Sequence, residues 1–226
     1  MMTGREARGD ERAGADLGRL VSVIPVGALE GAKSRLGGSL DAEERQDLVR
    51  YLLDRTISAV RGSPTIERVA VVSPDLEVLS VAKQSGAAPI EQVGTGLNEG
   101  LEQAVRWAIE SGASAVLIVA ADLPSVSAAA IHQVVATAAA AVQPGRGLVL
   151  VVPDRHGRGT NALLLSPPDV IRPSFGEDSR AAHEAAARAA GALNIELDGP
   201  LGLDLDLPAD LTLAEEFGLL DPARGG

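Results

Sequence analysis

The sequence predicts an α/β protein with a mostly parallel β-sheet that is covered by helices on both faces. Along most of the chain, short continuous apolar segments alternate with longer segments of helical period. Strands that are apolar at every position are typical of a parallel sheet, because both of its faces are buried. The 226 residues and the hydrophobic content of 46% suit one such domain. Aromatic residues make up only 2%, so the core must be built from Ala, Val, Leu and Ile.

The strands are expected at the apolar segments. Residues 20–26 and 115–120 are continuous apolar runs, which favour buried strands. Residues 148–152 and 161–165 are two further strands on either side of a glycine-rich turn. In chain order, the expected strands cover residues 20–26, 69–72, 87–91, 115–120, 148–152, 161–165 and 193–197.

The helices are expected between these strands. In residues 41–60, Leu48, Leu52 and Ile57 recur on one helical face, and Asp41 followed by Glu44 predicts a capping box at the start. The segment 127–142 is rich in alanine. In chain order, the expected helices cover residues 41–60, 76–83, 98–109, 127–142, 179–190 and 209–217.

Composition excludes several classes of protein. The net charge of −11 disfavours binding to a phosphate backbone, so nucleic acid is not an expected partner. The chain has no cysteine, and therefore neither disulfides nor thiolate metal sites. No apolar run reaches the roughly 18 residues of a membrane span. Residues 1–19 are polar and lack the apolar stretch of a signal peptide. We expect them to be a disordered tail of a cytoplasmic protein whose single domain covers residues 20–220.

Acidic residues in two distant segments are the strongest candidates for chemistry. Asp122 follows an apolar run, Asp204 and Asp206 follow a strand-like segment, and both segments continue as Asp-Leu-Pro. Proline redirects the chain after each strand, which would place carboxylates at the carboxyl edge of the sheet. Together they would form a divalent-metal site that holds nucleotide phosphates. Alternatively, Asp122 caps the helix near Ser127, and the other two are turn residues.

Polar side chains in two other segments are candidates for binding the nucleotide. Lys33 and Arg35 lie in a flexible loop after the first strand, where two cations could contact a triphosphate. Taken alone, these residues are more typical of an ordinary solvated loop, since the loop matches neither a Walker loop nor a GxGxxG fingerprint. Asn98 is placed to cap a helix, although its amide could also read a base edge.

Two glycine-containing turns could bind a small anion. Glycine permits close backbone approach to a ligand, and neighbouring hydroxyl and amide groups add hydrogen-bonding tips. The first turn could also be a plain hairpin connection, and the serine of the second could cap its helix. His183 lies one helical turn after that serine and is more often structural than catalytic in such a place. The candidates are Gly159, Thr160 and Asn161 in the first turn and Gly176 and Ser179 in the second.

Several short motifs resemble one enzyme family. They are AKSRL at 32–36, LN at 97–98, ADLP at 121–124, GTNALL at 159–164, FGEDS at 175–179 with His183, and DLDLPADL at 204–211. Together, over roughly residues 20–218, they resemble the guanylyltransferases of coenzyme F-420 biosynthesis, which act on 2-phospho-L-lactate or phosphoenolpyruvate. The acidic motifs are shared with many nucleotidyltransferases, whereas the other motifs are more specific to this family.

The resemblance implies a Rossmann-like, mixed sheet of the nucleotide-diphospho-sugar-transferase fold. The enzyme would join GMP from GTP to a small phospho-acid and release pyrophosphate. The acid would be 2-phospho-L-lactate, phosphoenolpyruvate or 3-phosphoglycerate, and the labile product would pass to the next transferase of the pathway. Leu207 departs from the family pattern, because many relatives have threonine there.

The resemblance also assigns roles to residues. Asp122 and Asp206 would hold Mg²⁺, and Lys33 and Arg35 would contact the triphosphate, with Asn98 on the same nucleotide side. Gly159, Thr160, Asn161, Gly176 and Ser179 would cradle the phospho-acid. Two other readings remain open: a nucleotidyltransferase with another acceptor, such as a molybdopterin guanylyl- or cytidylyltransferase, and a catalytically inert nucleotide-binding scaffold.

Overall fold

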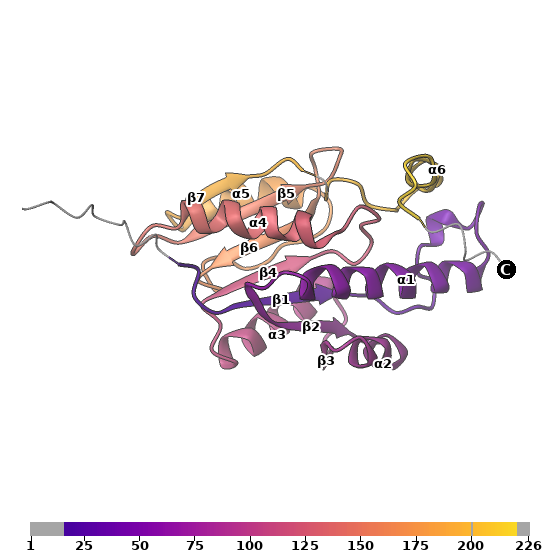
Figure 1. Cartoon of the computed structure of the whole chain (residues 1–226), viewed down its shortest axis with the longest axis horizontal. Coiled ribbons are helices and arrows are strands. Elements are labelled where there is room, and N and C mark those ends of the chain that lie inside the picture. The colour runs from indigo at the N-terminus through magenta and orange to yellow at the C-terminus, as the bar shows by residue number, and fades with distance from the viewer. Residues whose placement is uncertain (1–15, 200, 221–226) are drawn as a thin grey trace, which may run out of the picture.

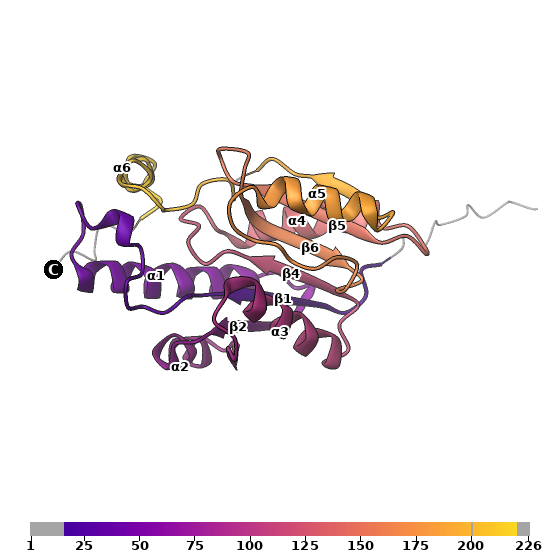
Figure 2. The same ribbon diagram turned by 180° about the vertical axis from the view of Figure 1, so that it is seen from behind.

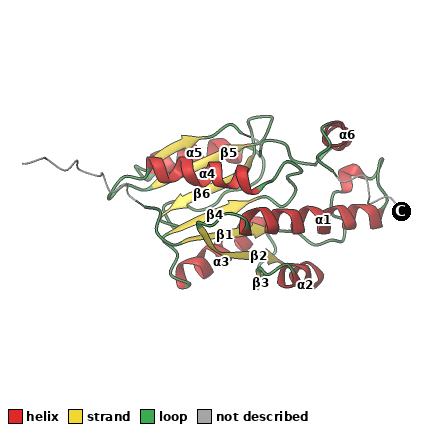
Figure 3. Cartoon of the chain, in the orientation of Figure 1, coloured by secondary structure: helices red, strands yellow, loops and turns green. Residues whose placement is uncertain are grey.

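The computed structural model describes residues 16–199 and 201–220, and in them a seven-stranded sheet is covered by helices on both faces (Figures 1 and 3). The strands are β1 (Leu20–Pro25), β2 (Ile66–Ser73), β3 (Ala88–Glu91), β4 (Ala115–Val119), β5 (Leu148–Pro153), β6 (Thr160–Ser166) and β7 (Leu193–Glu196). The helices are the short 3-10 helix η1 (Ser34–Leu36) and the α-helices α1 (Ala42–Arg61), α2 (Leu76–Gln84), α3 (Leu97–Glu110), α4 (Ala128–Ala141), α5 (Ser179–Ala189) and α6 (Pro208–Glu216).

The sheet is mixed and mostly parallel, as the sequence predicts. Its strand order is β3-β2-β1-β4-β6-β5-β7. Only β6 runs against its neighbours, β4 and β5, because a turn connects it directly to β5. The remaining pairs are parallel, so most strands end at the same edge of the sheet.

Alternate residues of the central strands enter two different cores. Leu20 and Ile24 of β1 face a core that is completed by α1, α2 and α4. Val21 and Val23 face the opposite core, which α3 and α5 complete. These last two helices are in front in the reverse view (Figure 2). Both faces of β1 are therefore dry, which explains why its sequence is apolar at nearly every position.

Helix α6 lies beyond the carboxyl ends of the strands, apart from the two main cores (Figure 1). A smaller apolar cluster holds α6 against α1. It consists of Leu52 of α1, Ala214 of α6 and Leu205 from the segment before α6. This contact brings the C-terminal segment of the chain to the edge where the parallel strands end.

Local predictions are mostly confirmed. Asp41 forms the expected capping box, in which Glu44 N donates to Asp41 Oδ1 at 2.9 Å and Asp41 N donates to Glu44 Oε2 at 2.7 Å. β2 begins at Ile66, three residues before its predicted start. The extension lies at the edge of the sheet, where exposed Glu67 and Arg68 interrupt the apolar pattern.

The prediction that Asp204 and Asp206 follow a strand is wrong. Residues 202–206 form no strand, and β7 already ends at Glu196. β7 is the last strand on its side of the sheet, and the chain leaves it after Glu196 without adding another strand. It crosses the end of the sheet instead, where Leu205 N donates to Asp122 O at 3.1 Å.

The predicted tail lies partly outside the described residues, which begin at residue 16. Within residues 16–19, Leu17 is 4% exposed and belongs to a main core, so the folded domain already includes this residue. No helix in the described part of the chain is long and apolar enough to cross a membrane.

Candidate active site

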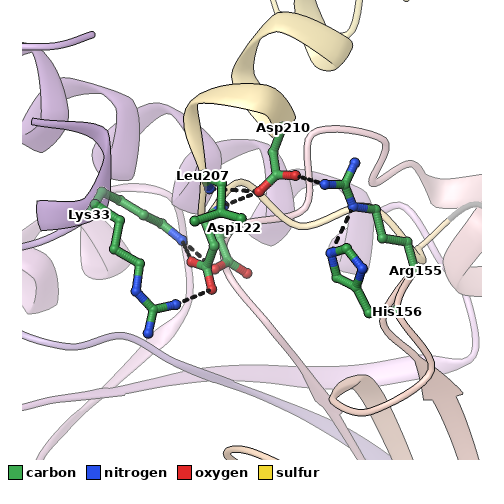
Figure 4. Close-up of polar contacts among 8 residues, drawn as sticks. Lys33, Asp122, Arg155, His156, Leu207 and Asp210 are labelled. Atoms are coloured by element: carbon green, nitrogen blue, oxygen red, sulfur yellow. Dashed lines mark hydrogen bonds and ion pairs between the residues drawn. The ribbon is translucent and has the colours of Figure 1, made fainter. Parts of the chain in front are cut away.

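The site lies where β1 and β4 end and where the segment before α6 crosses the edge of the sheet. After β1, the chain turns through a loop in which Lys33 adopts a left-handed conformation (φ 50°, ψ 37°) and begins η1. After β4, the next residues lead directly to Asp122. The backbone bond from Leu205 to Asp122 then brings Asp206 next to Asp122 and within hydrogen-bond distance of Lys33. Figure 4 labels Lys33 and Asp122 at this place.

Lys33 joins the two predicted metal ligands. Its Nζ donates to Asp122 Oδ2 at 2.5 Å and to Asp206 Oδ1 at 2.9 Å, and its side chain is 12% exposed. Burial lowers the pKa of Lys33, but the charges of the two carboxylates and their hydrogen bonds outweigh burial and hold this pKa above its usual value. Arg35 is largely exposed and lies 3.8 Å from Asp206. The predicted cations and carboxylates therefore meet in one cluster.

A third carboxyl group, that of Asp204, lies near this pair. Burial, followed by the charges of Asp122 and Asp206, raises the pKa of Asp204 to about 6. Because Asp122 and Asp206 bind the same ammonium atom, their oxygens converge on one cation position and so fit a divalent metal. In the described part of the chain, no three metal-binding side chains form a complete cage. Further ligands would come from phosphates and water.

Two cavities meet at these carboxylates. The first, of about 450 Å³, is lined by Gly27, Ala28 and Lys33 from the loop after β1. The second, of about 530 Å³, is lined by residues of both predicted acceptor turns, including Thr160 and Ser179. Their shared lining residues are Arg35, Leu97, Ala120, Asp122, Phe175 and Asp206. This arrangement suits two substrates that react at the common boundary.

Buried side chains connect the two predicted acceptor turns. Ser179 Oγ donates to Thr160 Oγ1 at 3.1 Å, and His183 Nδ1 lies 3.1 Å from the same oxygen. Ser174 N donates to His183 Nε2 at 2.9 Å, so that nitrogen accepts and Nδ1 carries the proton. Burial lowers the pKa of His183 to about 4, which keeps the ring neutral. Thr160 Oγ1 thus accepts two bonds and retains its own hydroxyl proton.

The glycines of the turns have different roles in the fold. Gly176 has φ +124°, a conformation that side chains rarely adopt, so this position needs glycine. At Gly159, an added Cβ would lie 2.8 Å from Asp154 Oδ2. The space beside this second glycine is therefore already taken by a carboxylate of the same hairpin.

Neither Asn98 nor Asp122 caps a helix, although the sequence allowed this for both. Gly96, not Asn98, is the N-cap of α3, because the helix begins one residue earlier than predicted. The Asn98 amide instead pairs with the backbone of Phe175: Nδ2 donates to O at 3.0 Å, and Phe175 N donates to Oδ1 at 2.8 Å. Ser127 caps α4 and leaves Asp122 free for the site.

Asn161 also forms bonds within the protein. Its Nδ2 donates to Leu201 O at 2.8 Å and to Gly202 O at 3.1 Å, and the residue is 5% exposed. The structure adds Arg155, Asp210 and Phe175 to the site, three residues for which the sequence predicted no role there. Asp210 had a recognisable signal, an acidic residue two positions after the proline that begins a helix, which is typical of a capping carboxylate.

Known proteins with similar sequences point to the same kind of site. Residues 20–214 match the protein family described as "Guanylyl transferase CofC like". The chain belongs to this family. It is 45% identical to the phosphoenolpyruvate guanylyltransferase of Sphaerobacter thermophilus over 193 residues, covering 84% of this chain and 90% of that protein. It is 42% identical to the protein of the same name from Rubrobacter xylanophilus, covering 87% and 94%.

Solved structures show the same fold at low sequence identity. A protein from Desulfovibrio desulfuricans G20, described as a nucleotide-diphospho-sugar transferase, matches with a TM-score of 0.69, 16% identity, and coverage of 94% of this chain and 92% of that chain. A nucleotidyl transferase from Methanothermobacter matches with a TM-score of 0.61, 16% identity, and coverage of 88% and 98%. The predicted fold class is confirmed, and the CofC-like chain is a guanylyltransferase.

Proposed function

We propose that this enzyme transfers GMP from GTP to phosphoenolpyruvate, or to a closely related phospho-acid, in coenzyme F-420 biosynthesis. The observation that carries the proposal is the pair of cavities that meet at Asp122 and Asp206. The relatives named phosphoenolpyruvate guanylyltransferase support this acid as the acceptor. GTP would occupy the cavity beside Lys33, and the acid would occupy the cavity beside Thr160.

The reaction needs positioning and charge neutralisation more than proton transfer. A phosphate oxygen of the acid attacks the α-phosphorus of GTP, a new phosphoanhydride bond forms, and the bond to pyrophosphate breaks. The nucleophile is already an anion, so no general base is required. The neutral, buried state of His183 agrees with this, since the ring holds the turn at Ser174 and the Thr160 hydroxyl.

The charged residues at the boundary would oppose repulsion between the two anionic substrates. Nucleotidyltransferases of this kind commonly use a divalent metal, and we propose Mg²⁺ held by Asp122 and Asp206. When bound, the metal supplies charge neutralisation for the phosphates and the leaving pyrophosphate. Lys33 would exchange its carboxylate bonds for phosphate contacts, and exposed Arg35 would reach the outer phosphates.

The acceptor cavity offers hydrogen-bond donors for a small acid. The remaining hydroxyl proton of Thr160 is available because Ser179 and His183 both donate to its oxygen. Gly176 would permit close backbone approach in the opposite turn. We retain Gly159, Asn161 and Ser179 as wall residues of this cavity rather than as direct donors.

A product assay tests the proposed function. Purified protein with GTP and Mg²⁺ is mixed separately with phosphoenolpyruvate, 2-phospho-L-lactate and 3-phosphoglycerate, and both pyrophosphate and the guanylylated acid are measured. Coupling to the next transferase captures a labile product. We expect phosphoenolpyruvate to give the highest kcat/KM, and replacement of GTP by CTP to abolish turnover. Turnover only with a molybdopterin acceptor, or none with any acceptor, would reject the proposal.

A further inference from the structure

The segment that carries Asp206 is irregular, yet several parts of the fold hold it. Residues 202–206 belong to neither helix nor strand, so the sheet supplies no ladder of hydrogen bonds. An irregular segment of this kind ordinarily samples several conformations. A carboxylate that acts with Asp122 must nevertheless keep a defined position, because small displacements reduce catalysis strongly.

Asp210 binds the backbone at the functional position itself. Its Oδ2 accepts from Asp206 N at 3.0 Å and from Leu207 N at 2.6 Å. Its side chain is 4% exposed, so little water competes for these bonds. The carboxylate of Asp210 therefore fixes the backbone of Asp206 and Leu207, and Figure 4 shows Asp210 beside Leu207.

Arg155 holds both Asp210 and the start of the same segment. Its Nη2 forms an ion pair with Asp210 Oδ1, on the side away from the two backbone bonds (Figure 4). Its backbone N donates to Gly202 O at 2.7 Å. Arg155 lies in the turn between β5 and β6, the hairpin that continues into Thr160 and the acceptor cavity. One residue thus connects the acceptor wall to the carboxylate segment.

We propose that Arg155 and Asp210 are positioning residues that set the Asp206 carboxylate against Asp122, an inference that rests on the proposed function. The charge of Arg155 compensates the buried carboxylate of Asp210, which lines the same cavity as Asp204 and Asp206. Without the charge of Arg155, the buried Asp210 carboxylate has no compensating partner, so it is more stable when it turns out into water. The two amides that it binds are then released, and Asp206 loses its defined place. A simple helix cap would stabilise α6 without affecting the chemistry.

The first test compares Arg155→Met with Arg50→Met in the full-length protein. Arg50 is a matched control: it also forms ion pairs, its side chain is 27% exposed against 28% for Arg155, and it bridges α1 and α2 away from the segment. Amide hydrogen exchange is followed by mass spectrometry without nucleotide. We expect protection of residues 201–207 to fall about tenfold or more in Arg155→Met only. Unchanged protection there would overturn the proposal.

The second test separates positioning from stability by kinetics. We expect Arg155→Met and Asp210→Asn each to lower kcat about tenfold or more, with KM for GTP changed less than about threefold. The double variant should lose little more than either single variant, because the two residues act as a unit. Equal kcat in Arg155→Met and Arg50→Met, or fully additive losses, would overturn the inference.

The two tests also distinguish this inference from the proposed function. If the wild-type protein transfers no guanylyl group to any acid, the proposed function fails, and the exchange experiment still reports whether Arg155 and Asp210 fix the segment. If the wild-type is active and exchange in residues 201–207 is insensitive to both substitutions, only the inference fails. Should Asp210→Asn not fold, Arg155→Met alone decides the outcome.

Discussion

Protonation of His183 should weaken the fold at mildly acidic pH. The ring is fully buried, and burial lowers its pKa to about 4 from the usual value of 6.5. In the folded protein, the neutral ring accepts from Ser174 N through Nε2. A protonated ring has no lone pair for this bond. The unfolded chain therefore binds the proton more readily, and stability present above the unfolded pKa is lost as pH falls from 6.5 towards 4.

The magnitude follows from the two pKa values. Between about pH 7.5 and about pH 5, the differential protonation of this one group removes about 2 kcal/mol from the free energy of unfolding. His183→Gln cannot titrate, although it can replace both hydrogen bonds in part. It loses the edge-to-face contact with Phe175, whose ring centroid lies 5.3 Å away, so we expect it to be less stable than wild type at neutral pH.

Urea denaturation of wild type and His183→Gln over this pH range measures the effect. The difference in unfolding free energy between the two proteins should shrink by about 2 kcal/mol from about pH 7.5 to about pH 5. Other titrating groups are common to both proteins and cancel in this difference. His132→Gln, on the exposed side of α4, is the matched control. Parallel pH profiles for wild type and His183→Gln would refute the assignment of a buried neutral ring.

Three further predictions concern the boundary between the cavities. Asp122→Asn and Asp206→Asn should each reduce kcat by about a hundredfold or more while the melting temperature stays near that of wild type, since each removes a charged metal ligand; near-normal turnover at saturating Mg²⁺ would exclude that residue as a ligand. Lys33→Met should raise KM for GTP about tenfold and hardly change KM for the acid, and steady-state kinetics that show the reverse would place the substrates in the opposite cavities. Asn98→Ala should cost about 1–3 kcal/mol of stability in denaturant titration, because it leaves the Phe175 backbone N–H and C=O unpaired. Since Phe175 lines both cavities, the substitution should impair the use of both substrates. An effect on GTP alone would instead support contact between the Asn98 amide and the base.

The fold and the place of Asp122 at a strand end could be predicted because their signals are local. Continuous apolar runs mark strands such as β1 and β4, whatever lies beside them in space. The capping box of Asp41 and Glu44 likewise depends on residues three positions apart. The carboxylate of Asp122 was recognisable because it follows a buried strand directly.

The sequence alone did not reveal the partners of polar side chains that bind a distant backbone. Asn98 has the residue type of a cap, but its partner is Phe175, 77 positions away. Asn161 resembles a ligand residue, but its partners are 40 and 41 positions further along the chain. Amide groups of this kind form equally good bonds with a ligand, a helix end or a loop, and the residue type alone does not choose among them.

By itself, the sequence determined the α/β class, the order of the elements, the family, and the residue types that can bind a metal and phosphates. Only the tertiary structure decided that Lys33, Asp122 and Asp206 share one cluster, and that an irregular segment held by Arg155 and Asp210 delivers the last of them. The physical reason is the range of the forces involved. Apolar periodicity and capping act over a few neighbouring residues, whereas the charges meet only after the sheet and its two cores have brought distant strand ends to one edge.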